Sequence, residues 1–302
     1  MAGGTAPEPA VLVTSRSFSS GALDLAAELE AAGLTVRRGP ADHDLRLLRP
    51  LLAGSVAWIA GTGPVTAAHL SAAPRLRVLA RYGVGVDAVD LAAATACGVT
   101  VTNTPGANTA AVADHTLALM LAALRSVVVG DRRVRAGDWR GWRARELGDL
   151  TVGIVGVGRI GRLVARRLAG FGCALRGHDP GVPAEELRRL AIEPAGLLEL
   201  ASGCDLVTLH SPGGGCVVDA AWLGAARPGL VLVNTARANL VDEAALAAAL
   251  HAGRVAAYAA DTVSGEGQGT ASSPLLDPAL AEVTVLTPHV AAQTMGAVDK
   301  MG

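Results

Sequence analysis

The chain contains 302 residues, of which 51% are apolar and 18% are charged, and its formal net charge is −1. A chain of this length favours two domains over one large core. The near-zero charge provides no general attraction to nucleic acid or anionic lipid, and no apolar run approaches the ~20 residues that cross a bilayer. Because residues 1–10 also lack a signal-peptide pattern, we expect a cytoplasmic protein with neither nucleic acid nor a membrane as a partner.

Positive charge is concentrated locally in residues 132–145, where six arginines accompany Trp139 and Trp142. Such a mixture of cations and aromatic rings can bind a nucleic-acid strand. The charge is not sustained elsewhere in the chain, so a solvated or subunit-contacting arm is the better interpretation.

The cysteines lie far apart without a CxxC pair, at Cys97, Cys173, Cys204 and Cys216. No cluster of His, Cys and carboxylate residues has the spacing of metal ligands. We therefore expect reduced thiols and no metal site.

The first hundred residues alternate short apolar runs with helical patterns, which predicts a small βα domain. Strands are expected at 11–13, 57–60 and 77–80, and a helix at 22–33. A long and largely apolar helix is expected at 108–127, with Asn108 or Thr109 as its cap.

From residue 150 onward the alternation is clearer and predicts a second doubly wound parallel sheet. A strand at 151–155 leads into a helix at 159–169 that Gly170 would end, and a helix at 243–252 lies between Asp242 as cap and Gly253. Further strands are expected at 173–177, 205–209, 230–234, 256–260 and 283–286. The predicted fold class is α/β, with two doubly wound parallel-sheet domains and a cleft between them.

A glycine motif, Gly156-Val157-Gly158-Arg159-Ile160-Gly161, stands where the strand at 151–155 meets its helix. Its backbone N–H groups and the helix N-terminus can approach a pyrophosphate. Asp179 closes the next strand, where a carboxylate can accept the ribose hydroxyls and repel a 2′-phosphate. The motif predicts a dinucleotide site that favours NAD; the alternative for Asp179 is a turn residue before Pro180.

A second glycine loop, residues 81–87, follows the strand at 77–80 and contains Arg81, Gly83, Val84 and Gly85. Successive amides without side chains at 83 and 85 can face an anion such as a substrate carboxylate. A purely structural turn remains the alternative.

Four charged or titratable residues, Arg237, Asp261, Glu266 and His289, follow the carboxyl ends of later strands, where doubly wound folds place ligands. Reduction of a ketone by hydride needs a proton donor at the oxygen and a cation near the carboxylate or carbonyl. His289 suits the first task and Arg237 the second. A carboxylate such as Glu266 would raise the pKa of His289 and orient its ring.

Other histidines could also be considered for catalysis. We interpret His115, on the long apolar helix, and His210, at the end of a strand, as structural or cofactor-lining. No constellation of residues supports a role for His43, His69, His178 or His251.

Taken together and in order, these motifs resemble the D-2-hydroxyacid dehydrogenase family, especially its D-3-phosphoglycerate dehydrogenase branch. The resemblance covers roughly residues 55–300 and includes the spacing from Arg237 to Glu266 to His289. The segments that carry it are RYGVGVDAVDLAAATACGVTVTNTPGANT (81–109), LTVGIVGVGRIGRLVARRLAGFG (150–172), VNTAR (233–237), VDEAALAAAL (241–250) and TPHVAAQT (287–294).

This resemblance implies an NAD-dependent oxidoreductase that acts on C2 of a small D-2-hydroxy or 2-oxo acid, phosphorylated acids included, with Arg237, Glu266 and His289 as catalytic residues. It implies a substrate domain at 1–103 and 289–302, an NAD domain at 104–288, and a homodimer. Substrate contacts would come from Arg81, Gly83, Val84, Gly85 and Arg237. Cofactor contacts would come from Val84, Gly156, Gly158, Arg159, Ile160, Gly161, Asp179, Ser211, Thr235, Ala236, Asp261 and Ala292.

The sequence departs from the family pattern around the expected site. Residues 213–216 shorten the loop after Ser211, Ala238-Asn239 replace a glycine pair, and Gly267 stands where a proline is usual. Two alternatives therefore stay open: a non-catalytic, NAD-sensing scaffold that resembles a corepressor, and a phosphite- or phosphonate-related dehydrogenase.

Overall fold

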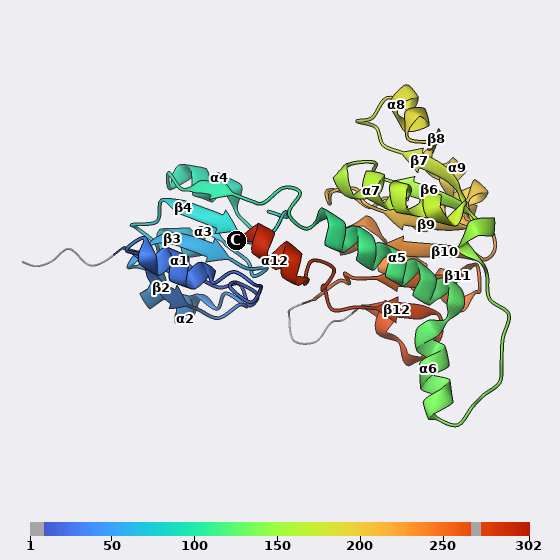
Figure 1. The fold of residues 1–302 in the computed structure, drawn as a ribbon, viewed down its shortest axis with the longest axis horizontal. Coiled ribbons are helices and arrows are strands. Elements are labelled where there is room, and N and C mark those ends of the chain that lie inside the picture. The colour runs from blue at the N-terminus through green and yellow to red at the C-terminus, as the bar shows by residue number, and fades with distance from the viewer. Residues whose placement is uncertain (1–8, 267–272) are drawn as a thin grey trace, which may run out of the picture. The chain divides into compact units, whose positions relative to one another are not determined.

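The structure is a computed structural model that describes residues 9–266 and 273–302. The chain divides into two compact units (Figure 1). The smaller unit contains the described residues up to Asn108 together with Ala292–Gly302, and the larger unit contains Thr109–Ala291. The domain limits expected from the sequence, after residues 103 and 288, fall slightly earlier in the chain.

The smaller unit is built on a five-stranded parallel sheet with the order β2-β1-β3-β4-β5. This is the flavodoxin-like arrangement of a doubly wound sheet. Its strands are β1 (Ala10–Val13), β2 (Thr35–Arg38), β3 (Ser55–Ala60), β4 (Val78–Arg81) and β5 (Thr100–Thr102). Its helices are α1 (Leu25–Ala31), α2 (Leu45–Leu52), α3 (Ala67–Ser71), α4 (Leu91–Ala96) and α12 (Met295–Met301).

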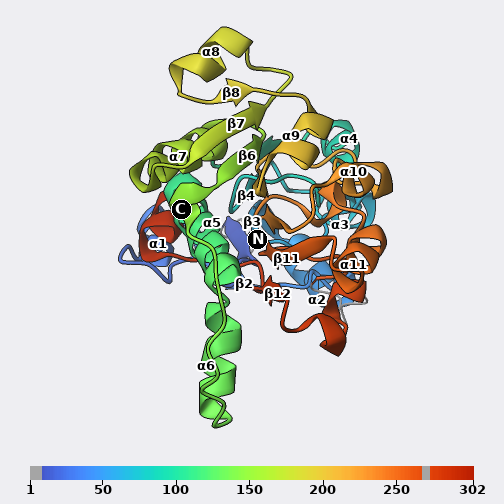
Figure 2. The same ribbon diagram turned by 90° about the vertical axis from the view of Figure 1, so that its right-hand side faces the viewer.

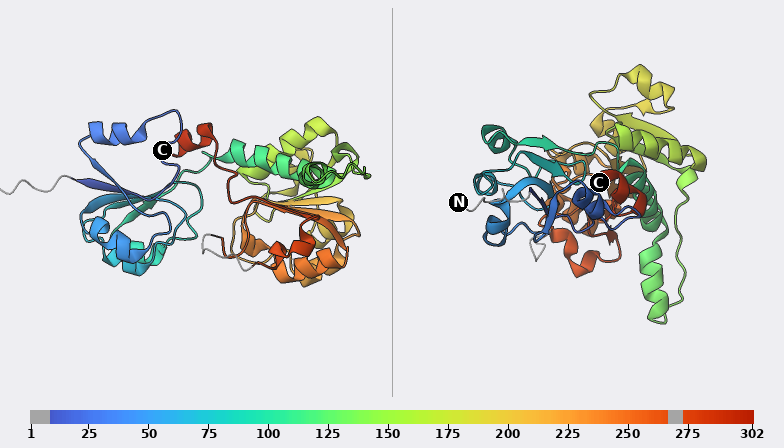
Figure 3. Two further views of the ribbon diagram at one scale, coloured as in Figure 1. Left: turned by 90° about the horizontal axis from the view of Figure 1, so that it is seen from below. Right: turned by 60° about the vertical axis from the view of Figure 1, so that its left-hand side comes forward.

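Alternate residues of the strands face opposite sides of this sheet, and each side is covered by helices. Leu12 and Trp58 pack with α2 and α3 on one side, while Val11 and Val13 pack with α1 and α12 on the other. Figure 3 shows the dark blue helix α1 and the red helix α12 on the same side of this sheet. The Tyr82 hydroxyl donates to the backbone oxygen of Val298 at 2.6 Å, which ties α12 to the end of β4.

A buried polar network in the smaller unit joins His43 and His69, for which the sequence indicates no partner. His43 Nε2 lies 2.7 Å from Thr14 Oγ1, and the Trp58 indole donates to the same hydroxyl at 2.9 Å. His69 Nε2 donates to the backbone oxygen of His43 at 2.8 Å. Burial lowers the pKa of His43 to about 4, so this ring is neutral at physiological pH and serves the core.

The larger unit is built on a seven-stranded parallel sheet with the order β12-β11-β10-β9-β6-β7-β8. The order reverses between β6 and β9, as in the Rossmann fold, and this switch point is where such sheets bind ligands. The strands are β6 (Thr151–Val155), β7 (Ala174–His178), β8 (Glu193–Pro194), β9 (Leu206–Leu209), β10 (Leu230–Asn234), β11 (Val255–Ala260) and β12 (Thr284–Leu286). The structure thus confirms two doubly wound parallel sheets.

Helices cover both faces of the larger sheet (Figures 2 and 3). Val231 and Val233 of β10 face α5 and α7, while Leu230 and Leu232 face the side of α9, α10 and α11. The α-helices are α5 (Thr109–Arg125), α6 (Val127–Arg135), α7 (Arg159–Leu168), α8 (Ala184–Arg189), α9 (Leu197–Gly203), α10 (Ala220–Ala225) and α11 (Glu243–His251). Short 3₁₀ turns lie at Leu147–Asp149, Ala169–Phe171, Ala238–Leu240, Pro274–Leu276 and Pro278–Leu280.

Local sequence explains both ends of α11, whereas the end of α7 differs from the expectation. The Asp242 carboxylate accepts from the N–H of Ala245, which caps α11, and Gly253 adopts a left-handed φ of 67° after it. The expectation that Gly170 ends the helix beginning at Arg159 is wrong. The chain continues through the 3₁₀ turn Ala169–Phe171, and Gly172, with φ 79°, makes the left-handed turn.

The helix α6 and the extended residues 136–146 after it project from the larger unit (Figures 1 and 2). Two arginines of α6 return to the segment before β12: Arg132 donates to the backbone oxygen of Ala281, and Arg133 pairs with Glu282 at 2.7 Å. Trp139 is 79% exposed. Among the described helices none alone has the length and apolar character to cross a membrane; only α5 and α6 together pass that test, as a pair bent by 58°.

Candidate active site

The glycine motif forms the turn between β6 and α7, on one of the two strands at the switch point of the larger sheet. Gly156 has a φ of 88°, and a Cβ there would lie 2.5 Å from the Ser211 nitrogen. A Cβ on Gly161 would overlap the backbone oxygen of Gly156, whereas Gly158 faces open space. The motif therefore provides a tight turn, close helix–strand packing and an unobstructed backbone that a pyrophosphate could approach.

Asp179 follows β7 and closes this loop from the side. Its carboxylate accepts from the N–H of Val157 at 2.7 Å and from the N–H of Gly181 at 2.8 Å. The first contact fixes the glycine turn and the second is the turn interaction that the sequence left as an alternative. One carboxylate therefore makes both backbone contacts.

A cavity of about 320 Å³ opens beside Asp179, with Glu199 also in its lining. Two carboxylates in one lining disfavour an additional phosphate there. Arg176, which the sequence places near Asp179, instead lies against Gly203, and His178 Nδ1 hydrogen-bonds to the Ala195 backbone oxygen at 3.1 Å. Arg176, the cation that could have offset the negative charge of this lining, is therefore engaged elsewhere.

The neighbouring strand β9 is followed by His210 and Ser211. Burial lowers the pKa of His210 to about 3, so its ring is neutral and unsuited to donate a proton. His210 Nδ1 and Ser211 Oγ are buried and have no hydrogen-bond partner among the residues that the structure describes. Such unpaired polar atoms are rare in folded proteins and are consistent with a polar ligand at this edge.

Arg237 lies in a sharp turn after β10 that Asn234 organises. The fully buried Asn234 side chain accepts from the Ala236 N–H at 3.0 Å and donates to the Arg237 backbone oxygen at 2.8 Å. The Arg237 guanidinium donates to the Ala236 backbone oxygen at 2.8 Å. Asn239, one of the residues that depart from the family pattern, lies against Gly213, where a Cβ would come within 3.1 Å of its Oδ1.

Glu266 and His289 meet in the structure. His289 Nδ1 and Glu266 Oε1 are 2.7 Å apart, and the two side chains are 41% and 42% exposed. The hydrogen bond to Glu266 raises the pKa of His289 against the opposing effect of burial; the charges of Glu266 and Asp261 raise it further, and the charge of Arg237 lowers it. With Nδ1 engaged, Nε2 is the nitrogen that can meet a substrate. The neighbouring Gly267 lies outside the described residues.

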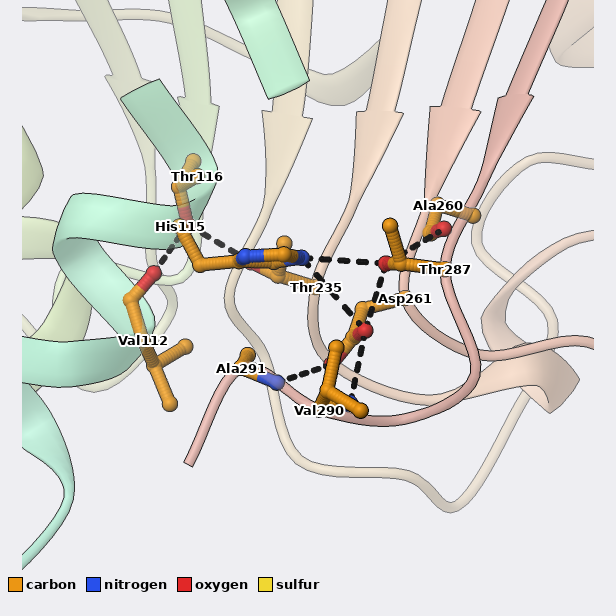
Figure 4. Close-up of polar contacts among 9 residues, drawn as sticks. All are labelled: Val112, His115, Thr116, Thr235, Ala260, Asp261, Thr287, Val290 and Ala291. Carbon is orange, nitrogen blue, oxygen red and sulfur yellow. Dashed lines mark hydrogen bonds and ion pairs between the residues drawn. The ribbon is translucent and has the colours of Figure 1, made fainter. Parts of the chain in front are cut away.

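Asp261, which is only 1% exposed, holds the loop that carries His289. Its carboxylate accepts from the N–H groups of Val290 and Ala291 at 2.9 and 2.8 Å, and from the Thr287 hydroxyl at 2.5 Å (Figure 4). His289 itself has a φ of 54°, a left-handed conformation that non-glycine residues rarely adopt. The backbone bonds on its C-terminal side hold this conformation in place.

Two residues of α5 reach the same region; the sequence indicated a structural or cofactor-lining role for His115 and no role for Thr116. His115 Nε2 lies 3.0 Å from Thr287 Oγ1 and 3.4 Å from Asp261 Oδ1, while Thr116 Oγ1 lies 2.8 Å from Thr235 Oγ1 (Figure 4). The polar pair His115-Thr116 within an apolar helix was the only signal that could have indicated this contact.

The second glycine loop belongs to the smaller unit. Gly83 has a φ of 138°, and the Thr104 N–H donates to its backbone oxygen at 3.1 Å. Asn103 Nδ2 donates to the Val84 oxygen at 2.8 Å, and the Arg81 guanidinium donates to the Tyr82 oxygen at 2.7 Å. These contacts fix the loop backbone, as an amide-lined anion site requires.

The predicted site residues thus lie in three groups within the described chain. Arg237, Asp261 and His289 follow β10, β11 and β12, which are consecutive neighbours in the larger sheet. The glycine motif, Asp179 and Ser211 surround the switch point of the same sheet. Residues 81–85 and Ala292 belong to the smaller unit.

Comparisons with known proteins agree with this fold. A family model described as "D-isomer specific 2-hydroxyacid dehydrogenase, NAD binding domain" matches residues 117–291. A D-3-phosphoglycerate dehydrogenase of Mycobacterium bovis is 38% identical over 299 residues, which cover 97% of this chain and 55% of that protein. A glyoxylate reductase of Korarchaeum cryptofilum is 38% identical over 240 residues, which cover 76% of this chain and 71% of that protein.

Among solved structures, the D-lactate dehydrogenase of Aquifex aeolicus in complex with NAD and lactic acid superimposes with a TM-score of 0.85 at 25% identity. The match covers 97% of this chain and 91% of that one. The chain spans about half the length of the curated D-3-phosphoglycerate dehydrogenases that it matches.

Proposed function

The chain belongs to the D-isomer specific 2-hydroxyacid dehydrogenase family, and on this premise we propose that it transfers a hydride between NAD(H) and C2 of a small D-2-hydroxy or 2-oxo acid. The observation that carries the proposal is the 2.7 Å contact between His289 and Glu266 at the carboxyl edge of the NAD-domain sheet. The same edge carries Arg237 on a neighbouring loop. A histidine whose pKa is raised by a carboxylate, at the same sheet edge as an arginine, is the arrangement that reduction of a 2-oxo acid requires.

The residues at the switch point fit the nucleotide. The turn of Gly156, Gly158 and Gly161 would hold the pyrophosphate, assisted by the backbone of Arg159 and Ile160 at the start of α7. Asp179 and Glu199 would border the adenosine ribose and disfavour NADP. Further contacts are proposed for Ser211, Thr235, Ala236, Asp261 and, from the smaller unit, Val84 and Ala292. The bound nicotinamide supplies or accepts the hydride at C2.

His289 handles the proton of the reaction. During reduction, the O2 oxygen of the substrate gains negative charge as C2 accepts the hydride, and His289 Nε2–H donates its proton to that oxygen. During oxidation the neutral ring accepts the hydroxyl proton from the same atom. Glu266 keeps Nδ1 protonated in both directions, so the ring presents Nε2 to the substrate throughout.

Arg237 supplies the positive charge for the substrate. Its planar guanidinium can hold a carboxylate by two parallel hydrogen bonds or polarise the carbonyl oxygen. The amides of Gly83, Val84 and Gly85 would take part in carboxylate binding from the smaller unit, which we propose as the substrate domain. Arg81, at the end of β4, is the candidate cation for a phosphate or second carboxylate, so 3-phosphoglycerate is included among the candidate substrates.

We also propose that the enzyme acts in the cytoplasm as a homodimer. The support for the dimer is the projecting α6, on which Val127, Val128 and Val134 are exposed, together with the exposed Trp139 and Trp142 in the segment after it. Apolar side chains gathered on a projecting segment are typical of a subunit contact. Sedimentation of the purified chain as a monomer at micromolar concentration would contradict this part of the proposal.

NADH consumption with a panel of 2-oxo acids, which includes glyoxylate, pyruvate, hydroxypyruvate and its phosphate ester, tests the activity. We expect turnover with at least one acid and loss of about 100-fold or more of kcat/KM in His289→Ala. His251→Ala is the matched control, because His251 contacts Asp277 at 3.2 Å on the surface. Undiminished turnover in His289→Ala would refute the proton donor.

Comparison of 3-phosphoglycerate with glycerate tests the phosphate role. Equal kcat/KM for both would exclude a phosphate contact at Arg81. NADH binding without turnover of any acid in the panel would instead favour the NAD-sensing scaffold.

A further inference from the structure

We propose that His115 and Thr116, adjacent residues of α5, are positioning residues that hold the two catalytic loops at a fixed separation. His115 contacts the loop of His289, and Thr116 contacts the loop of Arg237. The inference rests on the proposed function for its catalytic consequence, but its structural part concerns only the placement of these loops.

The first arm of the arrangement is a chain of hydrogen bonds from His115 through Thr287 to Asp261. The Thr287 hydroxyl has one proton, and the 2.5 Å distance to Asp261 Oδ1 shows that this proton goes to the carboxylate. Thr287 Oγ1 is therefore an acceptor toward His115, whose Nε2 must carry the proton at 3.0 Å. His115 thus donates into a chain that ends on the carboxylate holding Val290 and Ala291 (Figure 4).

The second arm runs through Thr116. Its hydroxyl proton is donated to the Val112 backbone oxygen at 2.8 Å within α5. The Thr235 hydroxyl, 2.8 Å away, must then donate to Thr116 Oγ1. Thr116 is fully buried and Thr235 nearly so, so loss of this acceptor would leave a buried hydroxyl without a partner.

The two arms have the same spacing relative to the catalytic residues. Thr235 precedes Arg237 by two positions, and Thr287 precedes His289 by two positions. Both anchors therefore lie at the base of a catalytic loop, and both are bonded to successive residues of one helix. A helix is stiff over one peptide unit, so α5 fixes the distance between the anchors more firmly than the intervening strands and loops could.

Apolar packing of α5 does not make these bonds redundant. Ala113, Leu117 and Met120 pack the helix into the core of the larger unit, but such contacts tolerate small shifts along the helix axis. Hydrogen bonds are directional, and a displacement of about 1 Å in a catalytic group can lower a rate about 100-fold. The polar pair therefore fixes the position of α5 along its axis, which burial alone does not.

The test compares His115→Phe and Thr116→Val with the control His251→Phe, which removes a surface His–Asp contact in the same unit. We expect kcat to fall about tenfold or more in the first two variants, with NADH affinity changed by less than about threefold, and no change in the control. His115→Gln, whose amide can donate near the position of Nε2, should restore most of kcat. Thr116→Ser should do the same for its site.

A second readout, independent of turnover, is the titration of His289 followed by NMR in histidine-labelled protein. Because the contact with Glu266 depends on loop placement, we expect the pKa of His289 to fall toward 6.5 in His115→Phe and to stay at the wild-type value in His251→Phe.

The outcomes separate the two hypotheses. If His115→Phe lowers only the melting temperature, with kcat and the His289 titration unchanged, the positioning role is refuted. If the wild-type protein turns over no acid in the panel while His115→Phe still shifts the His289 titration, the positioning role stands and the proposed activity fails. The double variant His115→Phe/Thr116→Val tests whether the two residues act together. If its effect equals the sum of the single effects, the residues act independently, which would contradict joint positioning through α5.

Discussion

The two ring nitrogens of His289 have different environments, and the difference determines how the residue responds to pH. Nδ1 is bonded to the Glu266 carboxylate, which raises the pKa of the ring, whereas Nε2 is left for the substrate. The protonated form required for reduction is populated below the raised pKa. It is lost as pH rises through that value.

Glu266→Gln should therefore move the pH profile. The amide cannot provide the negative charge, so the pKa of His289 falls and the alkaline limb of kcat/KM for reduction shifts to lower pH. For oxidation, which needs the neutral ring, the acid limb shifts to lower pH as well. The pH profiles of kcat/KM for reduction and for oxidation test this expectation. Glu282→Gln is the control, because Glu282 forms a surface pair with Arg133. An unchanged pH profile in Glu266→Gln would show that Glu266 does not set the pKa of His289.

Arg237→Lys should lower kcat/KM about 100-fold, because a lysine retains the charge but not the planar pair of donors. The effect should appear with every 2-oxo acid that is turned over, while the affinity for NADH stays close to that of the wild type. Arg254→Lys is the matched control, since Arg254 makes one exposed bond to the Gly224 backbone oxygen. Full activity in Arg237→Lys would show that only charge matters at this position.

At the residue level, sequence predicts the participants better than their contacts. Arg237, Glu266 and His289 follow strands and match the family spacing, so they could be proposed as site residues without a structure. The contact of His115 with Thr287 joins residues 172 positions apart, and it depends on how α5 packs across the strand ends. That packing is decided by apolar residues of the core, which carry no information about the polar pair beside them.

At the level of elements, the turn from β6 into α7 is the most constrained. Gly161→Ala should destabilise the larger unit by about 1–3 kcal/mol, because the new Cβ would overlap the backbone oxygen of Gly156, and it should weaken NADH binding. Gly170→Ala serves as the control, since a Cβ there meets no atom within 4 Å. Urea unfolding and NADH titration of both variants provide the measurement. Equal stability of the two would mean that the turn can relax.

Long, buried elements were predictable, whereas the strands β2 and β8 were not. The strands at 151–155, 230–234 and 256–260 are continuous apolar runs, and the structure places strands there within one residue. The strand β8 contains only Glu193 and Pro194, and β2 ends in two arginines, so neither shows an apolar pattern. The expected stop at Gly170 failed because a glycine in the sequence does not reveal which of two nearby glycines has the left-handed φ.

At the level of the whole molecule, the two units have separate cores, which favours two unfolding transitions. The glycine motif and Asp179 lie in the larger unit, so NADH should raise the melting temperature of one transition more than that of the other. At a free NADH concentration of 100 times Kd, the stabilisation is about 2.7 kcal/mol. Calorimetry with and without NADH measures it. Equal shifts of both transitions would show that the units unfold together.

The division into two units was anticipated from length and from the repeated β/α alternation, because each sheet needs helices on both faces and so forms its own core. Sequence could not fix where one unit ends, since α5 continues directly from the glycine and asparagine residues at 106–108. The expected limit after residue 103 lies at the end of β5, where the regular pattern stops.

The edges of the larger sheet have a further consequence for the behaviour of the protein at high concentration. Its outermost strands, β8 and β12, contain two and three residues, and Pro194 occupies half of the first. The long apolar strands are all interior, so a neighbouring molecule finds few unpaired amides on which to extend the sheet. The larger sheet of the native protein is thus shielded against edge-to-edge polymerisation, and aggregation through this sheet would have to begin from chains in which β6, β9 or β10 has been exposed by unfolding.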